Sequence, residues 1–258
     1  MLEVNDLCIY TKDRRETIVE SVSFNVGDGE TLGLIGESGS GKSMTSKCIM
    51  RLLDPRCFTI TGSVRWKNEE ILSVKLPKDF RGNRIGMITQ NPMTAFAPMI
   101  KLGKQLEMGF EPKGKASKKE FYERLNEALK RVNLYDMKKI INSYPDELSG
   151  GMLQRVMIAL TMMKGPELLI ADECTTAVDA ASEYMILGEL EKMKQNGMSM
   201  IVITHDFGVA ARLCDNAAVM KSGRIIEYGR IFDVLRSPGN EYTEQLVSSS
   251  MLFREGVC

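Results

Sequence analysis

Three short apolar runs in this chain have the character of buried strands. They are rich in Leu, Ile and Val, each is followed by a residue with recognisable chemistry, and they cover residues 31–35, 167–171 and 199–204. Helical patterns alternate with them: Ile186, Leu190 and Met193 fall on one face of the segment 180–195. This alternation predicts an α/β domain with a parallel sheet, whose ligand site lies at the carboxyl ends of the strands.

The middle of the chain has a different pattern. From about residue 91 to residue 163 it is mostly helical, interrupted by a loop rich in Pro, Gly and Lys at 111–119. Ser117 and Glu120 have the spacing of a capping box, which predicts a helix start. An amphipathic stripe follows at Phe121, Leu125, Leu129 and Val132. We therefore expect a helical subdomain over 91–163, inserted into an α/β core.

Length and composition narrow the class of protein. The 258 residues fit one large domain, expected at 1–240, with a tail of weak periodicity at 241–258. Lys plus Arg equals Asp plus Glu, 34 against 34, so the basic excess typical of nucleic-acid binding is missing and no nucleic-acid partner is expected. No apolar run approaches the length that spans a bilayer, and Glu3 and Asp6 interrupt any secretory signal. We expect a cytosolic chain that reaches a membrane only through a partner.

The six cysteines are scattered and form no CxxC pair. In a cytosolic chain this spacing predicts reduced, mostly buried thiols, and it argues against a disulfide framework or a zinc site.

The strongest motif is a glycine-rich turn between the first apolar strand and a helix. It fits the pattern GxxxxGK[ST] and consists of Gly36, Glu37, Ser38, Gly39, Ser40, Gly41, Lys42 and Ser43. Such a turn directs backbone N–H groups at phosphate oxygens, and the positive end of the next helix faces the same anion. We expect Lys42 to contact the β and γ phosphates and Ser43 to bind Mg²⁺. A chance lysine in a glycine-rich turn is the alternative, but it leaves the flanking strand and helix unexplained.

Two carboxylates follow the second apolar strand. Asp172 is expected to hold the Mg²⁺ shell, and Glu173 to orient and deprotonate the attacking water, a role typically worth about 10²–10⁴ in rate. Taken alone, a strand that ends in Asp-Glu is more often a helix-capping loop. With a phosphate-binding loop upstream, it predicts the second half of a nucleotide site.

A third segment offers a second place for phosphate. Ser149, Gly150 and Gly151 precede a long helix with an apolar stripe, so they form another candidate anion site. Because the first loop already satisfies one triphosphate, this segment indicates a second nucleotide that another subunit presents. An ordinary serine N-cap followed by flexible glycines is the alternative, and the pentapeptide 148–152 alone does not separate the two.

In order and approximate spacing, these segments resemble the Walker A, signature and Walker B motifs of ABC-transporter ATP-binding subunits. The resemblance implies roles for further residues. Gln90 would be the Q-loop glutamine that contacts Mg²⁺ or water, and His205, the chain's single histidine, would contact the γ-phosphate. Tyr10 would stack on adenine, and Asp179 would belong to the D-loop, 176–179, at a dimer interface. Without the resemblance, each of these residues is common in a turn, a strand end or a core.

The resemblance extends from residue 2 to about residue 242 and is nearest to the oligopeptide, dipeptide and nickel importer branch. The stretches 152–155 (Met-Leu-Gln-Arg) and 91–96 (Asn-Pro-Met-Thr-Ala-Phe), with the short C-terminus, look more like nickel-type members. One departure is Cys174, where the family usually has a proline that would fix φ. A second is the methionine that replaces the usual glutamine of the signature. Neither removes a catalytic group.

The resemblance also implies an architecture and a set of partners. The fold would be a P-loop NTPase (RecA-like) core with a parallel-rich sheet, an N-terminal antiparallel β region and the inserted helical subdomain. The activity would be ATP hydrolysis with ATP and Mg²⁺, each ATP lying between 36–43 of one cassette and 149–151 of another. Partners would be a second, non-identical ABC ATP-binding subunit, two integral membrane permease subunits and, indirectly, an extracytoplasmic solute-binding protein. The chain would then lie peripherally on the cytoplasmic face of the cell membrane.

Other classes of P-loop protein fit less well. An ABC ATPase of translation or DNA repair would carry a second cassette, or a coiled-coil or zinc insertion. A P-loop kinase would need a substrate lid and would not use 148–152, and a regulatory module without chemistry would not need Glu173 and His205. For transport, the apolar segment 92–102 is expected to line the groove for a membrane subunit, with Phe96 as a contact. The cargo, nickel, another metal complex or a short peptide, stays open.

Overall fold

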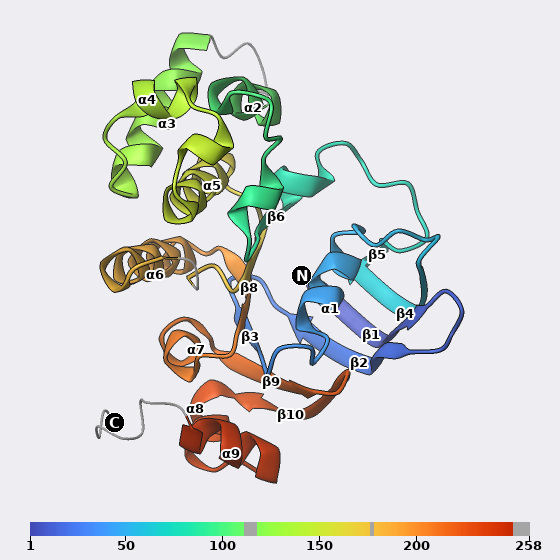
Figure 1. The fold of residues 1–258 in the computed structure, drawn as a ribbon. Coiled ribbons are helices and arrows are strands. Elements are labelled where there is room, and N and C mark those ends of the chain that lie inside the picture. Colours follow the sequence, from blue (N-terminus) through green and yellow to red (C-terminus); the bar gives the residue numbers. More distant parts are fainter. Residues whose placement is uncertain (111–117, 176–177, 250–258) are drawn as a thin grey trace.

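The computed structural model describes residues 1–110, 118–175 and 178–249. The predicted cap at Ser117, the first two D-loop residues and the end of the tail lie outside these ranges. In Figure 1 a sheet of mostly parallel strands stands between a group of helices on one side and a second, antiparallel sheet with helix α1 on the other. This arrangement confirms the expected α/β fold with an antiparallel N-terminal region.

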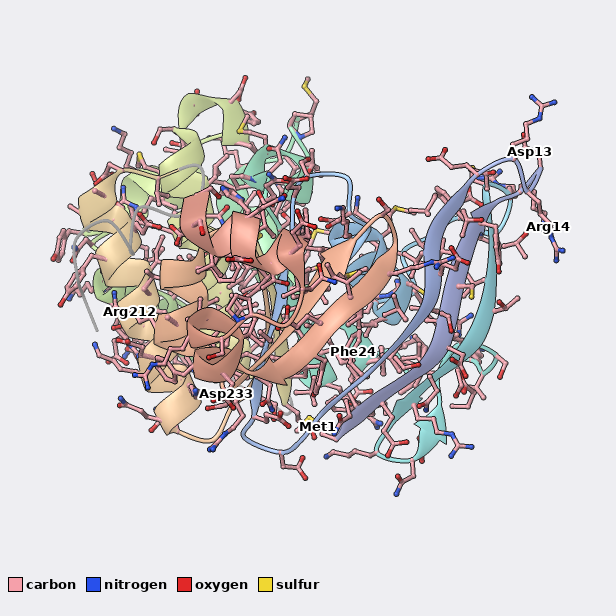
Figure 2. All side chains as sticks on the ribbon, turned by 90° about the horizontal axis from the view of Figure 1, so that it is seen from below. Met1, Asp13, Arg14, Phe24, Arg212 and Asp233 are labelled. Carbon is pink, nitrogen blue, oxygen red and sulfur yellow. The ribbon has the colours of Figure 1, made fainter. Side chains whose placement is uncertain are left out.

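The antiparallel sheet has four strands in the order β2-β1-β4-β5. Their bounds are Leu2–Thr11 for β1, Thr17–Val26 for β2, Phe58–Trp66 for β4 and Glu69–Glu70 for β5. One face is apolar: Leu2, Val4 and Ile9 are fully buried on β1, whereas the turn between β1 and β2, with Asp13 and Arg14, projects away from the body (Figure 2). This sheet therefore packs on one face only.

The larger sheet has six strands in the order β10-β9-β3-β8-β7-β6, all parallel except β10. Their bounds are Thr31–Ile35 for β3, Ile85–Ile88 for β6, Leu168–Asp172 for β7, Ser199–Thr204 for β8, Asn216–Lys221 for β9 and Arg224–Arg230 for β10. Two predicted strands match, and β7 begins one residue later than predicted because Glu167 is exposed. Asp172 is thus the last residue of its strand, and Glu173 is the first beyond it.

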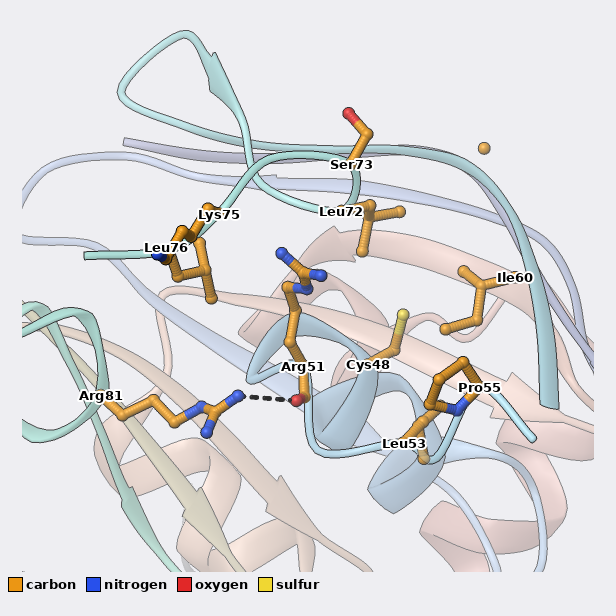
Figure 3. Close-up of a pocket in the computed structure, with 11 residues that line it drawn as sticks. Cys48, Arg51, Leu53, Pro55, Ile60, Leu72, Ser73, Lys75, Leu76 and Arg81 are labelled. Carbon is orange, nitrogen blue, oxygen red and sulfur yellow. Dashed lines mark hydrogen bonds between the residues drawn. The ribbon is translucent and has the colours of Figure 1, made fainter. Parts of the chain in front are cut away.

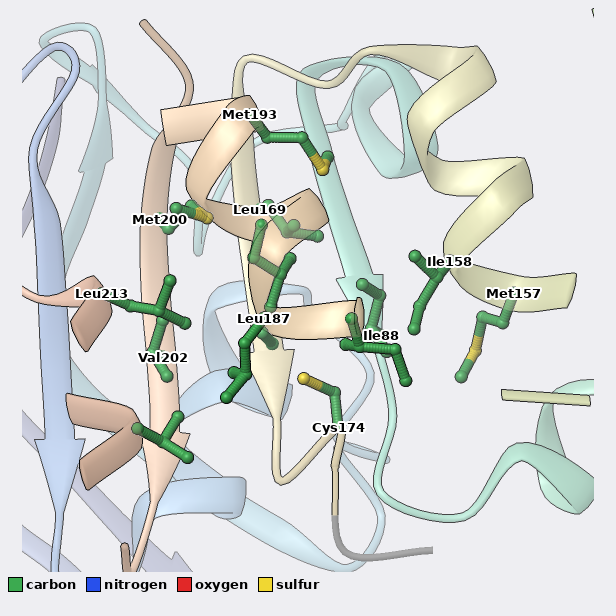
Figure 4. Packing of buried hydrophobic residues seen from close by; sticks show 14 of the residues in the cluster. Ile88, Met157, Ile158, Leu169, Cys174, Leu187, Met193, Met200, Val202 and Leu213 are labelled. Carbon is green, nitrogen blue, oxygen red and sulfur yellow. The ribbon is translucent and has the colours of Figure 1, made fainter. Parts of the chain in front are cut away.

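Successive residues of the central strands point into two different cores. Leu168 and Ile170 pack with α1 and the antiparallel sheet, whereas Leu169 and Ala171 pack with the helices of the other face. Figure 4 shows the second of these cores, where Leu169 meets Leu187 of helix α6. Burial on both faces explains the continuous apolar runs of the sequence, since neither face of these strands meets water.

Two of the helices were predicted individually: the one at 180–195 is α6, and the one that carries Phe121, Leu125 and Leu129 is α3. Their bounds are Lys42–Ile49 for α1, Leu102–Gly109 for α2, Lys118–Arg131 for α3, Met137–Asn142 for α4, Gly150–Lys164 for α5, Ala180–Gln195 for α6, Phe207–Leu213 for α7, Ile231–Arg236 for α8 and Glu241–Ser249 for α9. The stripe on α3 is buried, and α2 to α5 lie between β6 and β7 in the chain. None of the helices in the described ranges is both long and apolar enough to cross a bilayer.

The C-terminal segment differs from its prediction. Instead of a weakly periodic tail from residue 241, the structure has helix α9, on which Tyr242, Thr243 and Val247 are buried. Two of the three buried residues, the tyrosine and the threonine, are partly polar. The buried face of the helix therefore differs little in hydrophobicity from its exposed face. Hydrophobic periodicity therefore misses this helix.

The prediction that Phe96 lines an open groove was wrong. Phe96 is only 9% exposed and belongs to the core that contains Leu102 and Leu106. The short helical turn Pro92–Ala95 directs other side chains of this segment outward, and Met93 and Met99 are 42% and 86% exposed. The segment 92–102 therefore does expose apolar side chains, but these are Met93 and Met99 and not Phe96.

Candidate functional site

The glycine-rich loop connects the end of β3 to the start of α1 and packs tightly against other backbone. A Cβ atom on Gly36 would lie 2.2 Å from the carbonyl oxygen of Met220 on β9. Gly41 has a φ of 103°, and its Cβ would lie 3.1 Å from the carbonyl oxygen of Ile18 on β2. Both positions therefore require glycine. Because two sheets hold the loop, its backbone is fixed before any ligand arrives.

Lys42 occupies the concave side of this loop. Its side chain is only 4% exposed, and Nζ donates to the carbonyl oxygens of Gly36 and Glu37, each at 2.7 Å, and to Ser40 Oγ at 3.3 Å. Burial lowers the pKa of the ammonium, and the carboxylates of Glu173 and Asp172 oppose this shift. A buried cation whose acceptors are neutral carbonyl oxygens gains from a fully charged acceptor, so the loop fits a phosphate group.

A second oxygen-rich position lies beside it. Ser43 Oγ donates to Asp172 Oδ1 at 3.1 Å, which joins the first turn of α1 to the end of β7. Asp172 is 3% exposed, and burial raises the pKa of its carboxyl group, with a further contribution from Glu173. A carboxylate and a hydroxyl are the oxygen ligands that Mg²⁺ takes in proteins. The buried negative charge of Asp172 therefore suits a divalent cation.

The side chain of Glu173 is held between residues from two other strand ends. Gln90 Nε2 donates to Glu173 Oε2 at 2.7 Å, and His205 Nδ1 lies 3.6 Å from Glu173 Oε1. These three residues follow β6, β7 and β8, which are neighbours in the parallel sheet. Glu173 also has a φ of 44°, uncommon for a residue with a side chain, and its N–H donates to the carbonyl of Ile203 at 2.9 Å. The sheet thus fixes this carboxylate where a base needs fixed geometry.

The segment Ser149–Gly150–Gly151 is open to solvent. Ser149 is exposed and caps α5, its Oγ accepting from the N–H of Met152 at 3.3 Å, and a Cβ on Gly150 would meet nothing within 4 Å. Within the described ranges, no hydrogen bond or ion pair joins 149–151 to the loop 36–43. The start of α5 is therefore available to another molecule, as the hypothesis of two half-sites requires.

Two further predicted residues lie apart from this cluster. The carboxylate of Asp179 accepts from both the N–H and the hydroxyl of Ser182, at 3.0 and 2.7 Å, and so caps α6. These bonds lower the pKa of Asp179. Tyr10 lies near the end of β1 opposite Thr17, with the guanidinium carbon of Arg14 5.9 Å from its ring centroid. Neither residue touches the catalytic carboxylates.

The sequence analysis missed Tyr242 as a site residue. The N–H of Glu37 in the phosphate-binding loop donates to Tyr242 Oη at 3.3 Å, and the ammonium of Lys221 lies 4.4 Å from the tyrosine ring centroid. Tyr242 is 7% exposed, so its side chain is packed where α9 meets the loop. Its distance in sequence from the loop, 205 residues, explains why no local pattern indicates this contact.

Gln154 is a second residue whose role the sequence analysis missed. It is fully buried on α5, and its Nε2 donates to the carbonyl oxygens of Cys174 at 3.0 Å and Thr89 at 3.4 Å. These carbonyls adjoin Glu173 and Gln90, so one side chain connects the helix that begins at Ser149 to both segments of the catalytic cluster. A polar residue among the buried positions of an apolar helix is the signal that could have found it.

Cys174, which departs from the usual proline, packs into the helical core. It is 5% exposed, and burial raises the pKa of its thiol to about 12, so the thiol stays neutral. The five cysteines in the described part of the chain are free, as predicted.

Comparison with known proteins identifies relatives over nearly the whole chain. The family model described as ABC transporter matches residues 19–176. The oligopeptide transport ATP-binding protein OppD of Salmonella typhimurium is 42% identical over 257 residues, 96% of this chain and 76% of that protein. The dipeptide transport ATP-binding protein DppD of Haemophilus influenzae is 38% identical over 261 residues, 99% of this chain and 79% of that protein. A dimeric ATP-binding cassette, solved in a post-hydrolysis state with ADP and phosphate, superposes with a TM-score of 0.78 at 28% identity, covering 90% of this chain and 99% of that one.

The buried charge of Asp172 leads to a stability prediction. Because its folded pKa is raised above the ordinary value of 3.8, the ionised form destabilises the fold above that raised pKa. Asp172→Asn should therefore raise the melting temperature at pH 7 by about 2–4 °C, what roughly 1 kcal/mol gives in a domain of this size. Calorimetry should show the difference in melting temperature between the variant and the wild type narrowing as the pH falls through the raised pKa, because protonation removes the buried charge. The exposed Asp28→Asn is the control, and an Asp172→Asn protein no more stable than this control would contradict the argument.

The contact of Tyr242 with the loop leads to a binding prediction. Tyr242→Phe keeps the ring over Lys221 but removes the acceptor for the N–H of Glu37. Nucleotide affinity should fall by about threefold to tenfold, the worth of one neutral hydrogen bond of 0.5–1.5 kcal/mol. Fluorescence titration with a labelled ATP measures this change, with the exposed Tyr228→Phe as control. Equal affinities for the two variants would show that α9 does not position the loop.

Proposed function

Since the chain belongs to the ABC transporter family and is an ATPase of that family, we propose that it energises an importer of short peptides or of nickel and other metal complexes. The observation that carries this proposal is the meeting of Glu173 with Gln90 and His205 beside the Ser43–Asp172 pair. The names of the oligopeptide and dipeptide relatives support a peptide cargo. The nickel alternative rests only on the resemblance of the stretch 152–155 to nickel-type members.

In this proposal the residues divide the work on one ATP. The backbone N–H groups of the loop 36–43 and the ammonium of Lys42 bind the phosphates. Ser43 and Asp172, with Gln90 beside them, would hold Mg²⁺, which when bound neutralises charge on the phosphate oxygens. Glu173 accepts the proton of the attacking water, and His205 contacts the γ-phosphate. Tyr10 stacks on adenine from β1.

The second half of each site comes from another cassette. Ser149, Gly150 and Gly151 are proposed to bind the γ-phosphate of a nucleotide held by a partner, and Asp179 to lie at the shared interface. The solvent-facing start of α5 and the dimeric state of a similar cassette support this arrangement. ATP then favours the closed dimer and hydrolysis favours the open one, which drives a conformational cycle. We propose a non-identical ABC subunit as the partner.

The helical subdomain, proposed at 91–163 within a domain of 1–240, would receive the membrane subunits. Three of its methionines are exposed: Met93 and Met99 follow the Q-loop, and Met108 on α2 is 67% exposed. Exposed apolar side chains of this kind mark interaction surfaces, and methionine adapts to irregular partners. The proposed partners are two integral permease subunits, which in turn receive cargo from an extracytoplasmic solute-binding protein. This places the chain peripherally on the cytoplasmic face of the membrane.

The assignment of Glu173 is tested by Glu173→Gln, which keeps the shape of the side chain and removes the base. ATP hydrolysis should fall by about 10²–10⁴, while ATP binding stays within about twofold of wild type. Phosphate release and equilibrium binding measure the two effects separately, and the exposed Glu69→Gln is the control. Turnover near the wild-type rate would remove Glu173 from its role.

The transport function is tested at Met99. Met99→Asp places a charge on the exposed surface, so it should abolish cargo uptake and co-purification with integral membrane subunits while basal ATPase activity stays unchanged. Phe232→Asp, at an exposed phenylalanine of α8, is the matched control. Normal uptake by Met99→Asp would exclude this docking surface. If the wild-type chain co-purified with ribosomes or DNA-repair proteins, and not with a membrane protein, the non-transport ABC ATPase would be correct.

A further inference from the structure

A cavity of about 650 Å³ lies at the opposite end of α1 from the phosphate-binding loop (Figure 3). Its walls come from the C-terminal end of α1 with the chain just beyond it, from β4, and from the segment 72–76 together with Arg81. The volume lies within the range of sites for drug-sized ligands. None of the residues assigned to nucleotide binding lines it, so the cavity is separate from the proposed nucleotide site.

One part of the cavity is apolar. Its wall is formed by the side chains of Cys48, Leu53, Ile60, Leu72 and Leu76. Figure 3 shows Cys48, Leu53 and Ile60 gathered on the same side of the space. Burial raises the pKa of the Cys48 thiol to about 12, so this residue stays uncharged and behaves as a small apolar group. The wall therefore suits the hydrocarbon or aromatic body of a ligand.

Three of the other lining residues are cationic: Arg51, Lys75 and Arg81. Arg51 Nη1 donates to the carbonyl oxygen of Val74 and, at 3.2 Å, to that of Ile71. These two bonds hold the guanidinium against the segment 71–74. Arg81 donates to the carbonyl oxygens of Met50 at 3.0 Å and Arg51 at 2.9 Å, the second bond being drawn in Figure 3. These contacts fix both arginines in place and leave part of each guanidinium without an acceptor among the described residues, so each can still donate to a ligand.

Lys75 adds a third positive charge, and its ammonium makes no ion pair or hydrogen bond within the described ranges. None of the eleven lining residues is acidic. Two carboxylates in neighbouring segments are engaged: Asp54 pairs with Arg56 at 2.7 Å, and Glu70 accepts hydrogen bonds from Ser63 and from backbone N–H groups. Three cationic residues thus line one cavity, and no lining residue supplies a carboxylate to balance them, which favours an anion.

We propose that this cavity is a binding site for a small amphipathic organic anion, with its apolar body against Ile60 and Leu72 and its charged head near Arg51, Lys75 and Arg81. A carboxylate, phosphate or sulfonate head satisfies the free guanidinium N–H groups. The volume suits a free, drug-sized molecule, so we assign the site to a soluble anion and not to a membrane lipid. This proposal does not rest on transport.

The fluorescent anion anilinonaphthalene sulfonate has the required chemistry, and uncharged N-phenylnaphthylamine is its matched control. Titration of the full chain should show one saturable site for the sulfonate, with affinity about tenfold weaker for the uncharged compound, the worth of one hydrogen bond to a charged group. Saturating ATP should leave the signal unchanged, because the two sites lie at opposite ends of α1. Displacement by ATP would place the sulfonate in the nucleotide site and overturn the proposal.

Three variants localise the binding. Lys75→Glu should weaken sulfonate binding by about tenfold and leave the uncharged compound unaffected, since a charge is reversed at the rim. Ile60→Trp should abolish binding of both compounds by filling the cavity, with an unchanged melting temperature showing that the fold is intact. Lys78→Glu reverses an exposed charge outside the lining and is the control. Equal sulfonate affinities for Lys75→Glu and Lys78→Glu would overturn the proposal, as would retention of binding by a folded Ile60→Trp protein.

Discussion

The cost of burying two opposite charges at one end of a parallel sheet governs the organisation of this protein. Lys42 and Asp172 are both almost inaccessible, and burial shifts the pKa of each towards its neutral form. Each is held by hydrogen bonds that only partly replace water, Lys42 by loop carbonyls and Asp172 by Ser43. In the proposed complex, a triphosphate with a divalent cation would supply both missing counter-charges at once. The two charges that burial destabilises would then be the ones that contact the ligand.

The proposed catalytic groups depend on the same sheet edge. Gln90, Glu173 and His205 each follow a different strand, and the order β8-β7-β6 makes these strand ends neighbours. The positive φ of Glu173 and its backbone bond to Ile203 direct the carboxylate between the other two side chains. Backbone strain of this kind persists only where the surrounding structure holds it, here two flanking parallel strands buried on both faces.

Contacts far from the phosphates connect this edge to the moving parts that the proposed cycle requires. Gln154 joins the start of α5, open to a partner, to the carbonyls beside Glu173 and Gln90. Tyr242 joins α9 to the glycine-rich loop, and Arg81 donates to the carbonyls of Met50 and Arg51 just beyond α1. Binding at the loop or at the proposed second half-site therefore acts on one packed unit. Packed side chains and hydrogen bonds of this kind can carry coupling between sites.

Local sequence determined the parts of this protein whose physics is local. The loop 36–43, the buried strands and the helix 180–195 were all predicted, because glycine geometry, burial on both faces and helical periodicity each leave a pattern within a few residues. The sequence also led to the hypothesis that Ser149 belongs to a site shared between two copies, and this stays a prediction. Residue types alone did not decide which of these segments meet.

Tertiary structure decided what depends on distant segments. The burial of Phe96, the helix at 241–249 and the contact of Tyr242 with Glu37 follow from packing between elements far apart in the chain. The same holds for the cavity between α1 and β4, whose cations are separated by up to thirty residues. A side chain's exposure is set by whatever folds over it, and that information is absent from its own neighbourhood in the sequence.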